Sequence, residues 1–162
     1  MKIRSGQKLP QNDFFYLDEK NEVKKITTSN LFKNQKAIIL GMPGAFTKVC
    51  SAKHLPGYVK NYELVKSKGI SKIVCIAVND PNVMKAWGES QKVDGKIFMA
   101  GDPFCKFTMA IGAETDKSEK GLGIRSTRYT MLVENELVKL IKEEKETGYC
   151  EISAAENFLN EI

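Results

Sequence analysis

Apolar runs and helical patterns alternate along the chain, and this alternation predicts the class of fold. Three short runs are almost wholly apolar and read as strands, over residues 37–42, 72–78 and 96–102. The run KIVCIAV at 72–78 is apolar on both faces, which is typical of a strand in the middle of a sheet. Each run is followed by a helical pattern, so strands and helices are expected to alternate.

Helix signals follow each of these strands. The first helical segment has apolar residues at steps of four and three, namely Leu55, Val59, Tyr62 and Val65. It should stop at Gly69, and Pro56 inside the pattern predicts a kink or an interruption. The second segment starts with Asp80 as N-cap and Pro81 at the first helical position. A third, short helix is expected over 103–112.

Hairpins are predicted near both ends of the chain. Residues 13–27 read as two short strands around a turn at 18–21. Residues 128–141 read as a second hairpin that turns near Asn135. Neither hairpin interrupts the alternating strands and helices between them.

The last segment and the length complete the expected architecture. Residues 153–162 predict a closing helix with Ser153 as its cap and Glu156 at the capping-box position. The elements together predict an α/β arrangement: a mixed central sheet flanked by helices, with an N-terminal hairpin. With 162 residues and no linker or repeat, we expect one domain over residues 1–162.

Charge and hydropathy narrow the classes of function. The net charge of +5 comes from 22 lysines spread along the chain and only three arginines, a pattern of a solvated surface rather than a nucleic-acid site. No apolar run reaches the length of a membrane span, and the N-terminal segment lacks the apolar core of a secretory signal. We therefore expect no nucleic-acid or membrane partner and a cytoplasmic location, with an organelle as the alternative.

Four cysteines are the candidate chemical groups: Cys50, Cys75, Cys105 and Cys150. They form neither a CxxC pair nor a set with metal-ligand spacing, and the chain has a single histidine. No structural zinc site is therefore expected. A chain without a secretory signal is expected to keep its thiols reduced, so each cysteine has to be judged on its local setting.

Cys50 has the most informative setting. Pro43 rigidifies the turn after the strand 37–42, and Gly44 allows a close approach of the backbone. Thr47 is a good N-cap residue, which places Cys50 in the first turn of the following helix. The sulfur then lies near unpaired N–H groups and the positive end of the helix dipole, a setting that favours the thiolate. A small buried thiol with no chemical role is the alternative on this pattern alone.

Three further residues are candidates for the same site. Arg128 stands at the entry to an apolar strand, which suggests that it faces a site and stabilises the Cys50 thiolate. A surface arginine paired with a carboxylate is the alternative. Arg125 precedes it in a loop and is the weaker candidate. His54 lies one turn after Cys50 on the same helix face and would either polarise the thiol or contact a partner. We favour a packed interface side chain for His54, because the helix dipole and an arginine suffice to activate a thiol.

These residues resemble a known family. The segment PGAFTKVCSAKHLPGY is similar to the active-site segment of the peroxiredoxins, with their Pro-x-x-x-Thr-x-x-Cys motif at Pro43, Thr47 and Cys50. The segments KGISKIVCIAVNDPNVMKAW, EKGLGIRSTRYTMLVE and SAAENFL resemble the type II, peroxiredoxin-five-like subfamily. The resemblance runs from about Ile38 to the C-terminus. It departs at Lys48, where the family often has a proline.

The resemblance implies a thioredoxin-like fold, a homodimer, and reduction of hydrogen peroxide and alkyl hydroperoxides without a metal or organic cofactor. It implies the peroxidatic role for Cys50, surrounded by Thr47, Pro43 and Arg128. Thiolate attack on the weak O–O bond would give a sulfenic acid and water or an alcohol.

The reductant is less well defined by the sequence. Cys75 matches a second cysteine of plant type II members, and Cys150 lies near the resolving position of animal members, yet both are expected to be ordinary packed thiols. We therefore expect direct reduction by glutathione or glutaredoxin, with a two-cysteine cycle and thioredoxin as the alternative. Two other classes of enzyme are disfavoured. A cysteine hydrolase needs a histidine base with an orienting residue, and no such residue is evident for the single histidine. A thiol-disulfide oxidoreductase normally has a CxxC pair, which this sequence lacks. A thioredoxin-fold binding module without catalysis is the remaining alternative.

Overall fold

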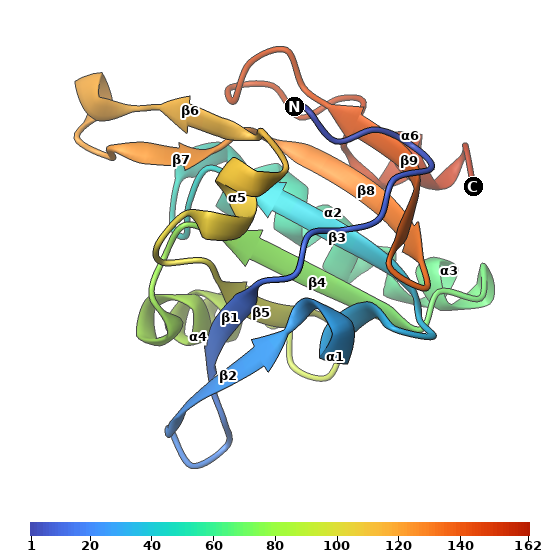
Figure 1. Cartoon of the computed structure of the whole chain (residues 1–162), viewed down its shortest axis with the longest axis horizontal. Helices are drawn as coiled ribbons and strands as arrows, with labels where there is room; N and C mark the ends of the chain where they lie inside the picture. Colours follow the sequence, from blue (N-terminus) through green and yellow to red (C-terminus); the bar gives the residue numbers. More distant parts are fainter.

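A seven-stranded mixed sheet runs through the centre of the protein (Figure 1). The computed structural model describes residues 1–162. The strands of this sheet are β1 (Asp13–Leu17), β2 (Val23–Thr27), β3 (Lys36–Met42), β4 (Lys72–Ala77), β5 (Phe98–Gly101), β8 (Tyr129–Glu134) and β9 (Leu137–Glu143). Their order is β2-β1-β5-β4-β3-β8-β9, and only β3, β4 and β5 are mutually parallel. The predicted mixed sheet with an N-terminal hairpin is therefore confirmed.

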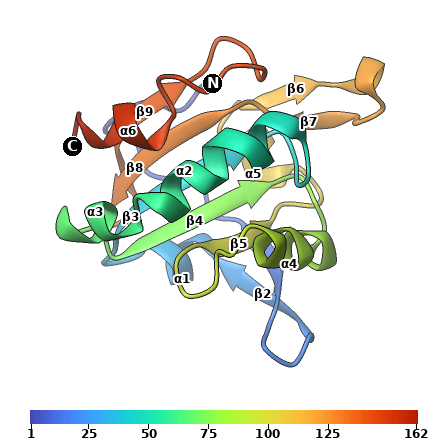
Figure 2. The ribbon, with the colours of Figure 1, turned by 180° about the vertical axis from the view of Figure 1, so that it is seen from behind.

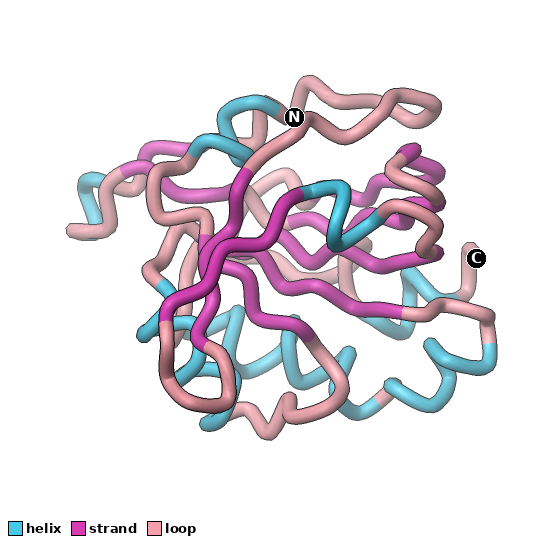
Figure 3. The backbone as a smooth tube through the Cα atoms, turned by 60° about the horizontal axis from the view of Figure 1, so that its bottom comes forward, coloured by secondary structure: helices cyan, strands magenta, loops and turns pink.

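Helices cover both faces of the sheet. They are α1 (Thr28–Phe32), the π-helical turn η1 (Cys50–His54), α2 (Leu55–Lys60), α3 (Tyr62–Ser67), α4 (Pro81–Ser90), α5 (Lys106–Ala110), the short 3-10 helix η2 (Ser118–Lys120) and α6 (Ala155–Leu159). Figure 2 shows α2, α4 and α6 in front of the strands, whereas α1 and α5 lie on the other side in Figure 1. In the view of Figure 3, most of the helical segments gather below the strands. None of the helices combines the length and apolar character needed to cross a bilayer.

The side chains of β3 explain why helices pack on both faces of the sheet, because successive apolar residues point to opposite faces. Ile38, Leu40 and Met42 belong to a core that includes Trp87 and Phe158 of the helices on one side. The alternate residues of β3 belong to a second core with Phe14, Phe32 and Phe107 on the opposite side. Successive side chains of a strand point to opposite faces, so an all-apolar strand must be buried twice.

The hairpin β8–β9 turns at Asn135, as predicted. Asn135 and Glu136 have φ angles of 49° and 66°, which is the left-handed pair of a two-residue turn between strands of this twist. The two-stranded ribbon of β6 (Glu114–Asp116) and β7 (Ile124–Ser126) was not predicted. Its strands are three residues long and largely polar, so they carry no clear alternation.

The prediction for the closing helix was only partly right. The helix α6 is shorter than expected and its N-cap is Ala154, without a side-chain capping bond. The Ser153 hydroxyl instead donates to the carboxylate of Glu144 at 2.8 Å. A buried carboxylate has to be hydrogen-bonded within the protein, whereas a helix end near solvent can bond to water. The Ser153 hydroxyl therefore bonds to Glu144 and does not cap the helix.

Candidate active site

The loop after β3 is held by residues from two neighbouring elements. The backbone N–H of Ala45 donates to Asn79 Oδ1 at 2.9 Å, and Asn79 lies just beyond β4. Arg125 of β7 donates from Nη1 to the Pro43 carbonyl at 3.4 Å. A Cβ at Gly44 would lie 2.6 Å from the same nitrogen, so this close approach depends on glycine. The loop thus forms at the carboxyl end of two parallel strands, where open α/β sheets place their sites.

Thr47 begins the helix that carries Cys50. Its carbonyl accepts from Ser51 N at 3.0 Å, the first bond of the helix. Its hydroxyl does not cap the helix, contrary to the expectation, because it donates back to the Gly44 carbonyl at 2.8 Å. Thr47 therefore closes the loop onto the helix start, and no hydrogen bond joins it to the Cys50 sulfur.

The interruption predicted at Pro56 is present as a widened helical turn. The N–H of Leu55 donates to the Cys50 carbonyl, five residues back, rather than four. Proline has no N–H and clashes with the carbonyl four residues before it, which is Ala52 here. A π-helical turn relieves that clash without ending the helix. Cys50 and His54, the first and last residues of this turn, are both fully buried.

Arg128 lies directly against Cys50. Both terminal nitrogens of its guanidinium, Nη1 and Nη2, are 3.4 Å from Cys50 Sγ. The side chain is only 1% exposed, and none of the ion pairs in the chain includes it. A buried cation without a carboxylate is costly. The Cys50 sulfur is the side-chain atom that faces both terminal nitrogens of this cation.

The remaining contacts of Arg128 come from two directions. Nη2 donates to the main-chain carbonyl of Thr147 at 2.9 Å, and Nη1 lies 3.3 Å from His54 Nδ1. Its Nε has no hydrogen-bond partner. The Thr147 contact was missed from the sequence, because a backbone carbonyl has no residue-type signature.

His54 is an internal side chain rather than part of an exposed interface. Burial, and then the nearby charge of Arg128, lower its pKa to about 3. A neutral ring that faces the arginine cannot act as a cation beside the thiol. The expected interface position is therefore wrong for the chain by itself, because the π-helical turn directs this residue into the core.

The other three cysteines are free thiols. Cys75 of β4 is fully buried, and burial followed by the proximity of Cys50 raises its pKa well above the usual value. Burial is also the main reason why the pKa values of Cys105 and Cys150 are raised. Cys150 is the most accessible of the four, and its sulfur lies 3.9 Å from the Ser153 hydroxyl.

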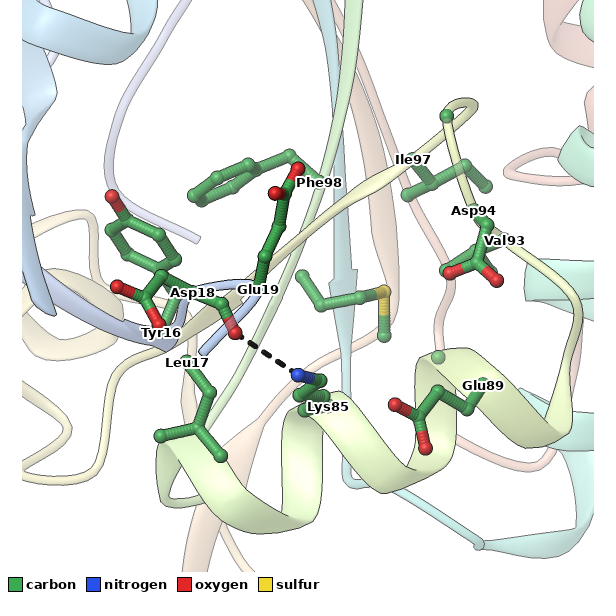
Figure 4. A pocket seen from close by; sticks show the side chains of 13 residues that line it. Tyr16, Leu17, Asp18, Glu19, Lys85, Glu89, Val93, Asp94, Ile97 and Phe98 are labelled. Atoms are coloured by element: carbon green, nitrogen blue, oxygen red, sulfur yellow. Dashed lines mark hydrogen bonds between the residues drawn. The ribbon is translucent and has the colours of Figure 1, made fainter. Parts of the chain in front are cut away.

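A surface pocket of about 400 Å³ lies elsewhere, between the β1–β2 hairpin, α4 and β5 (Figure 4). Lys85 crosses it and donates to the Asp18 carbonyl at 3.0 Å. No residue predicted for the cysteine site lines this pocket.

Comparisons with known proteins agree with this geometry. The Redoxin family model matches residues 4–159. Peroxiredoxin-2D of Arabidopsis thaliana is 36% identical over 160 residues, covering 99% of this chain and 98% of the relative. Reduced Prx3 of Vibrio vulnificus in complex with H2O2 is 37% identical, with a TM-score of 0.92 and 98% of each chain covered. The Plasmodium falciparum antioxidant protein, a 1-Cys peroxiredoxin, is 29% identical, with a TM-score of 0.91 over 99% of this chain and all of the other. The chain therefore belongs to the type II peroxiredoxins, thiol-dependent peroxidases with a thioredoxin-like fold.

Proposed function

We propose that Cys50 is the residue that attacks peroxide. Its thiolate attacks one peroxide oxygen, an S–O bond forms and the O–O bond breaks. The leaving oxygen takes a proton and departs as water or an alcohol, while Cys50 becomes a sulfenic acid. The observation that carries this proposal is the buried Arg128 guanidinium, which places two nitrogens 3.4 Å from Cys50 Sγ and has no carboxylate partner.

The surrounding residues have distinct proposed roles. Arg128 stabilises the negative charge that moves from sulfur to the leaving oxygen, and its unpaired Nε is a free donor for that oxygen. Thr47 holds the loop and retains lone pairs that accept from a peroxide O–H. Pro43 is buried and shields the sulfur from water, and Gly44 lets the loop approach Arg125.

Cys50→Ser tests the central assignment. The variant is expected to consume no peroxide in the presence of a thiol, because a serine hydroxyl is neither acidic nor nucleophilic enough to replace the thiolate. Cys105→Ser is the matched control and is expected to retain turnover. Retained turnover in Cys50→Ser would refute the assignment.

We propose that glutathione, alone or through glutaredoxin, reduces the sulfenic acid directly. The glutathione thiol forms a disulfide with Cys50 and releases water, and a second thiol releases Cys50 as a thiol. The raised pKa values of Cys75, Cys105 and Cys150 support this, because thiols with raised pKa values have little attacking thiolate. The relative described as a 1-Cys peroxiredoxin supports it as well.

Intact mass measurement distinguishes this cycle from a two-cysteine cycle with thioredoxin. After one equivalent of peroxide and then glutathione, the wild type should gain the mass of one glutathione on Cys50. The variant without Cys75, Cys105 and Cys150 should keep most of its glutathione-dependent turnover. An intramolecular disulfide as the main product, with loss of turnover in Cys150→Ser or Cys75→Ser, would establish the alternative.

The assembly state is proposed to be a homodimer. Phe46 in the Cys50 loop is 58% exposed, and Ile124, next to the loop-binding Arg125, is 46% exposed. Large apolar side chains at one rim favour contact with another protein surface. Sedimentation of wild type and Phe46→Lys tests this: a monomeric wild type would refute it, and a dimer weakened in the variant would support it.

Two further proposals concern the whole chain. Residues 1–162 are proposed to unfold as one domain, supported by a single sheet that joins β1 near the N-terminus to β9 near the C-terminus. One cooperative transition in denaturant would be the expected result.

A cytoplasmic location is proposed because all four thiols are free, as suits a reducing compartment. Imaging of a tagged full chain would test it.

A further inference from the structure

A buried histidine contacts the guanidinium of Arg128. Nη1 of Arg128 is bonded to Cys50 Sγ at 3.4 Å and lies 3.3 Å from His54 Nδ1. Nη2 is shared between the same sulfur and the Thr147 carbonyl. The two terminal nitrogens therefore each have one bond to the sulfur and one to a further acceptor, and His54 supplies the only side-chain acceptor besides the sulfur.

The chemistry of arginine fixes the tautomer of His54. A guanidinium only donates hydrogen bonds, so Nδ1 of the ring must be the acceptor. The ring proton is then on Nε2, which donates to Thr130 Oγ1 at 3.0 Å. Thr130 in turn donates its single hydroxyl proton to the Ser153 carbonyl at 2.7 Å. The Tyr58 hydroxyl shares these last two oxygens, at 3.2 Å from Thr130 Oγ1 and 3.1 Å from the Ser153 carbonyl. The bonds whose direction is determined are therefore Arg128–His54 and His54–Thr130.

The ring also stays neutral. His54 is fully buried, and burial together with the Arg128 charge lowers its pKa to about 3. A protonated ring would set an N–H against the N–H groups of the arginine. A neutral acceptor has a consequence that a carboxylate would not have: it orients the guanidinium without neutralising it. The full positive charge is left for the sulfur.

We propose that His54 is a positioning residue for the peroxide step, which holds the Arg128 guanidinium against Cys50 Sγ, and that Thr130 holds the His54 ring in the required tautomer. This inference rests on the proposed role of Cys50 as the attacking residue. It assigns to the histidine neither acid–base chemistry nor contact with peroxide. His54 acts only by setting the position and orientation of the Arg128 guanidinium relative to Cys50 Sγ.

Three substitutions separate hydrogen bonding from packing. In His54→Asn the amide oxygen takes the place of Nδ1 and keeps an acceptor for Arg128. His54→Leu fills a similar volume without an acceptor. Thr130→Val keeps the histidine and the shape of its neighbour but removes the acceptor for Nε2–H. Trp87 is the only tryptophan and donates from Nε1 to Ser51 Oγ at 3.0 Å, so its fluorescence reports on the residue next to Cys50.

The experiment measures the second-order rate of Trp87 fluorescence change with hydrogen peroxide, the pH dependence of Cys50 alkylation, and unfolding in denaturant. His54→Leu should slow the peroxide step by about tenfold to a hundredfold, since a misplaced catalytic group of this kind costs about that much. Its alkylation curve should move to higher pH. His54→Asn should restore most of the rate, and Thr130→Val should fall between the two.

Several results would overturn the proposal. Equal rates and alkylation curves in wild type and folded His54→Leu would do so, as would equal losses in His54→Leu and His54→Asn, which would indicate packing alone. If His54→Leu does not fold, an unchanged rate in Thr130→Val decides against the proposal and a slowed rate supports it. Failure of the proposed function is distinguishable, because wild type would then show no reaction that Cys50→Ser removes.

Discussion

Glu144 and Ser153 are joined by two hydrogen bonds to one carboxylate oxygen. The Ser153 N–H and hydroxyl donate to Glu144 Oε1 at 2.9 and 2.8 Å, and the Glu151 N–H adds a third bond at 2.7 Å. The segment between them therefore forms a closed loop after β9. This loop presents the Thr147 carbonyl to Arg128, so a carboxylate outside the site helps to shape it.

Glu144→Ala is expected to loosen this loop. Hydrogen bonds to a charged group contribute about 1.5–3 kcal/mol each at most, and they are not additive, so the free energy of unfolding should fall by about 2–4 kcal/mol. The peroxide rate should fall too, because Arg128 loses a fixed acceptor. Glu146→Ala is the matched control, since Glu146 is exposed in the same loop. Equal stability of the two variants would contradict the expectation.

Arg128→Met should retain the fold and lose most of the peroxide reactivity. The substitution removes a buried cation at similar length, so stability should change little. The rate should drop by about 10²–10³, the typical effect of removing one donor to a transition-state charge. Stopped-flow measurement and pH-dependent alkylation would show this, with Arg4→Met as an exposed control. An unchanged alkylation curve and rate would remove Arg128 from the site.

His54 should make the protein less stable as the pH falls from about 6.5 towards 3. The unfolded chain takes up the histidine proton near its ordinary pKa of 6.5, whereas the folded chain does so at about 3. The stabilising contribution is therefore complete above pH 6.5 and is lost below it, at up to about 1.4 kcal/mol per pH unit.

Denaturant unfolding between pH 5 and 6.5 tests this, with His54→Asn as the comparison. His54 is the only histidine, and the carboxyl groups common to both proteins cancel in the difference. The wild-type curve should slope and the variant curve should be flatter. Parallel curves would show that His54 is not buried as a neutral ring.

Gly41→Ala should damage the site from within the sheet. Gly41 of β3 pairs with Tyr129 of β8, and an added Cβ would overlap the Tyr129 ring. Overpacking of this kind costs about 1–3 kcal/mol. Displacement of Tyr129 moves the adjacent Arg128, so the peroxide rate should fall as well. Gly148→Ala has free space around the new methyl group and serves as the control; equal stabilities would show that the sheet absorbs the strain.

Local patterns were sufficient to predict the elements that build the site. The apolar run before Pro43 predicts β3, and the helical spacing after Cys50 predicts the helical segments α2 and α3. Both patterns lie within the elements that they predict, so no distant contact was needed to find them. Arg128 was identifiable because a cation at the entry of an apolar strand requires a partner. Pro56 likewise predicted an interruption, although the sequence did not specify a π-helical turn.

Residues whose role depends on distant partners could not be placed in the same way. Serine is a common helix-capping residue, but the Ser153 hydroxyl donates to the carboxylate of Glu144 instead of capping α6. Thr47 also looked like a cap, and its hydroxyl returns to the loop that precedes it. His54 was expected at an interface because the spacing places it on the same helix face as Cys50, but the spacing does not show that this side chain is buried in the core. For Ser153 and His54 the deciding contact joins different elements of the fold, whereas for Thr47 it depends on the conformation of its own loop.

The widened turn at Cys50 makes the start of this helix easier to unwind than the rest. The Leu55 N–H reaches back five residues to the Cys50 carbonyl, and Pro56 has no N–H, so residue 56 donates no backbone bond to this turn. Peroxide is small enough to react with a sulfur that has no exposed surface, whereas a tripeptide thiol is not. A reductant of that size can therefore reach Cys50 Sγ only when this first turn opens.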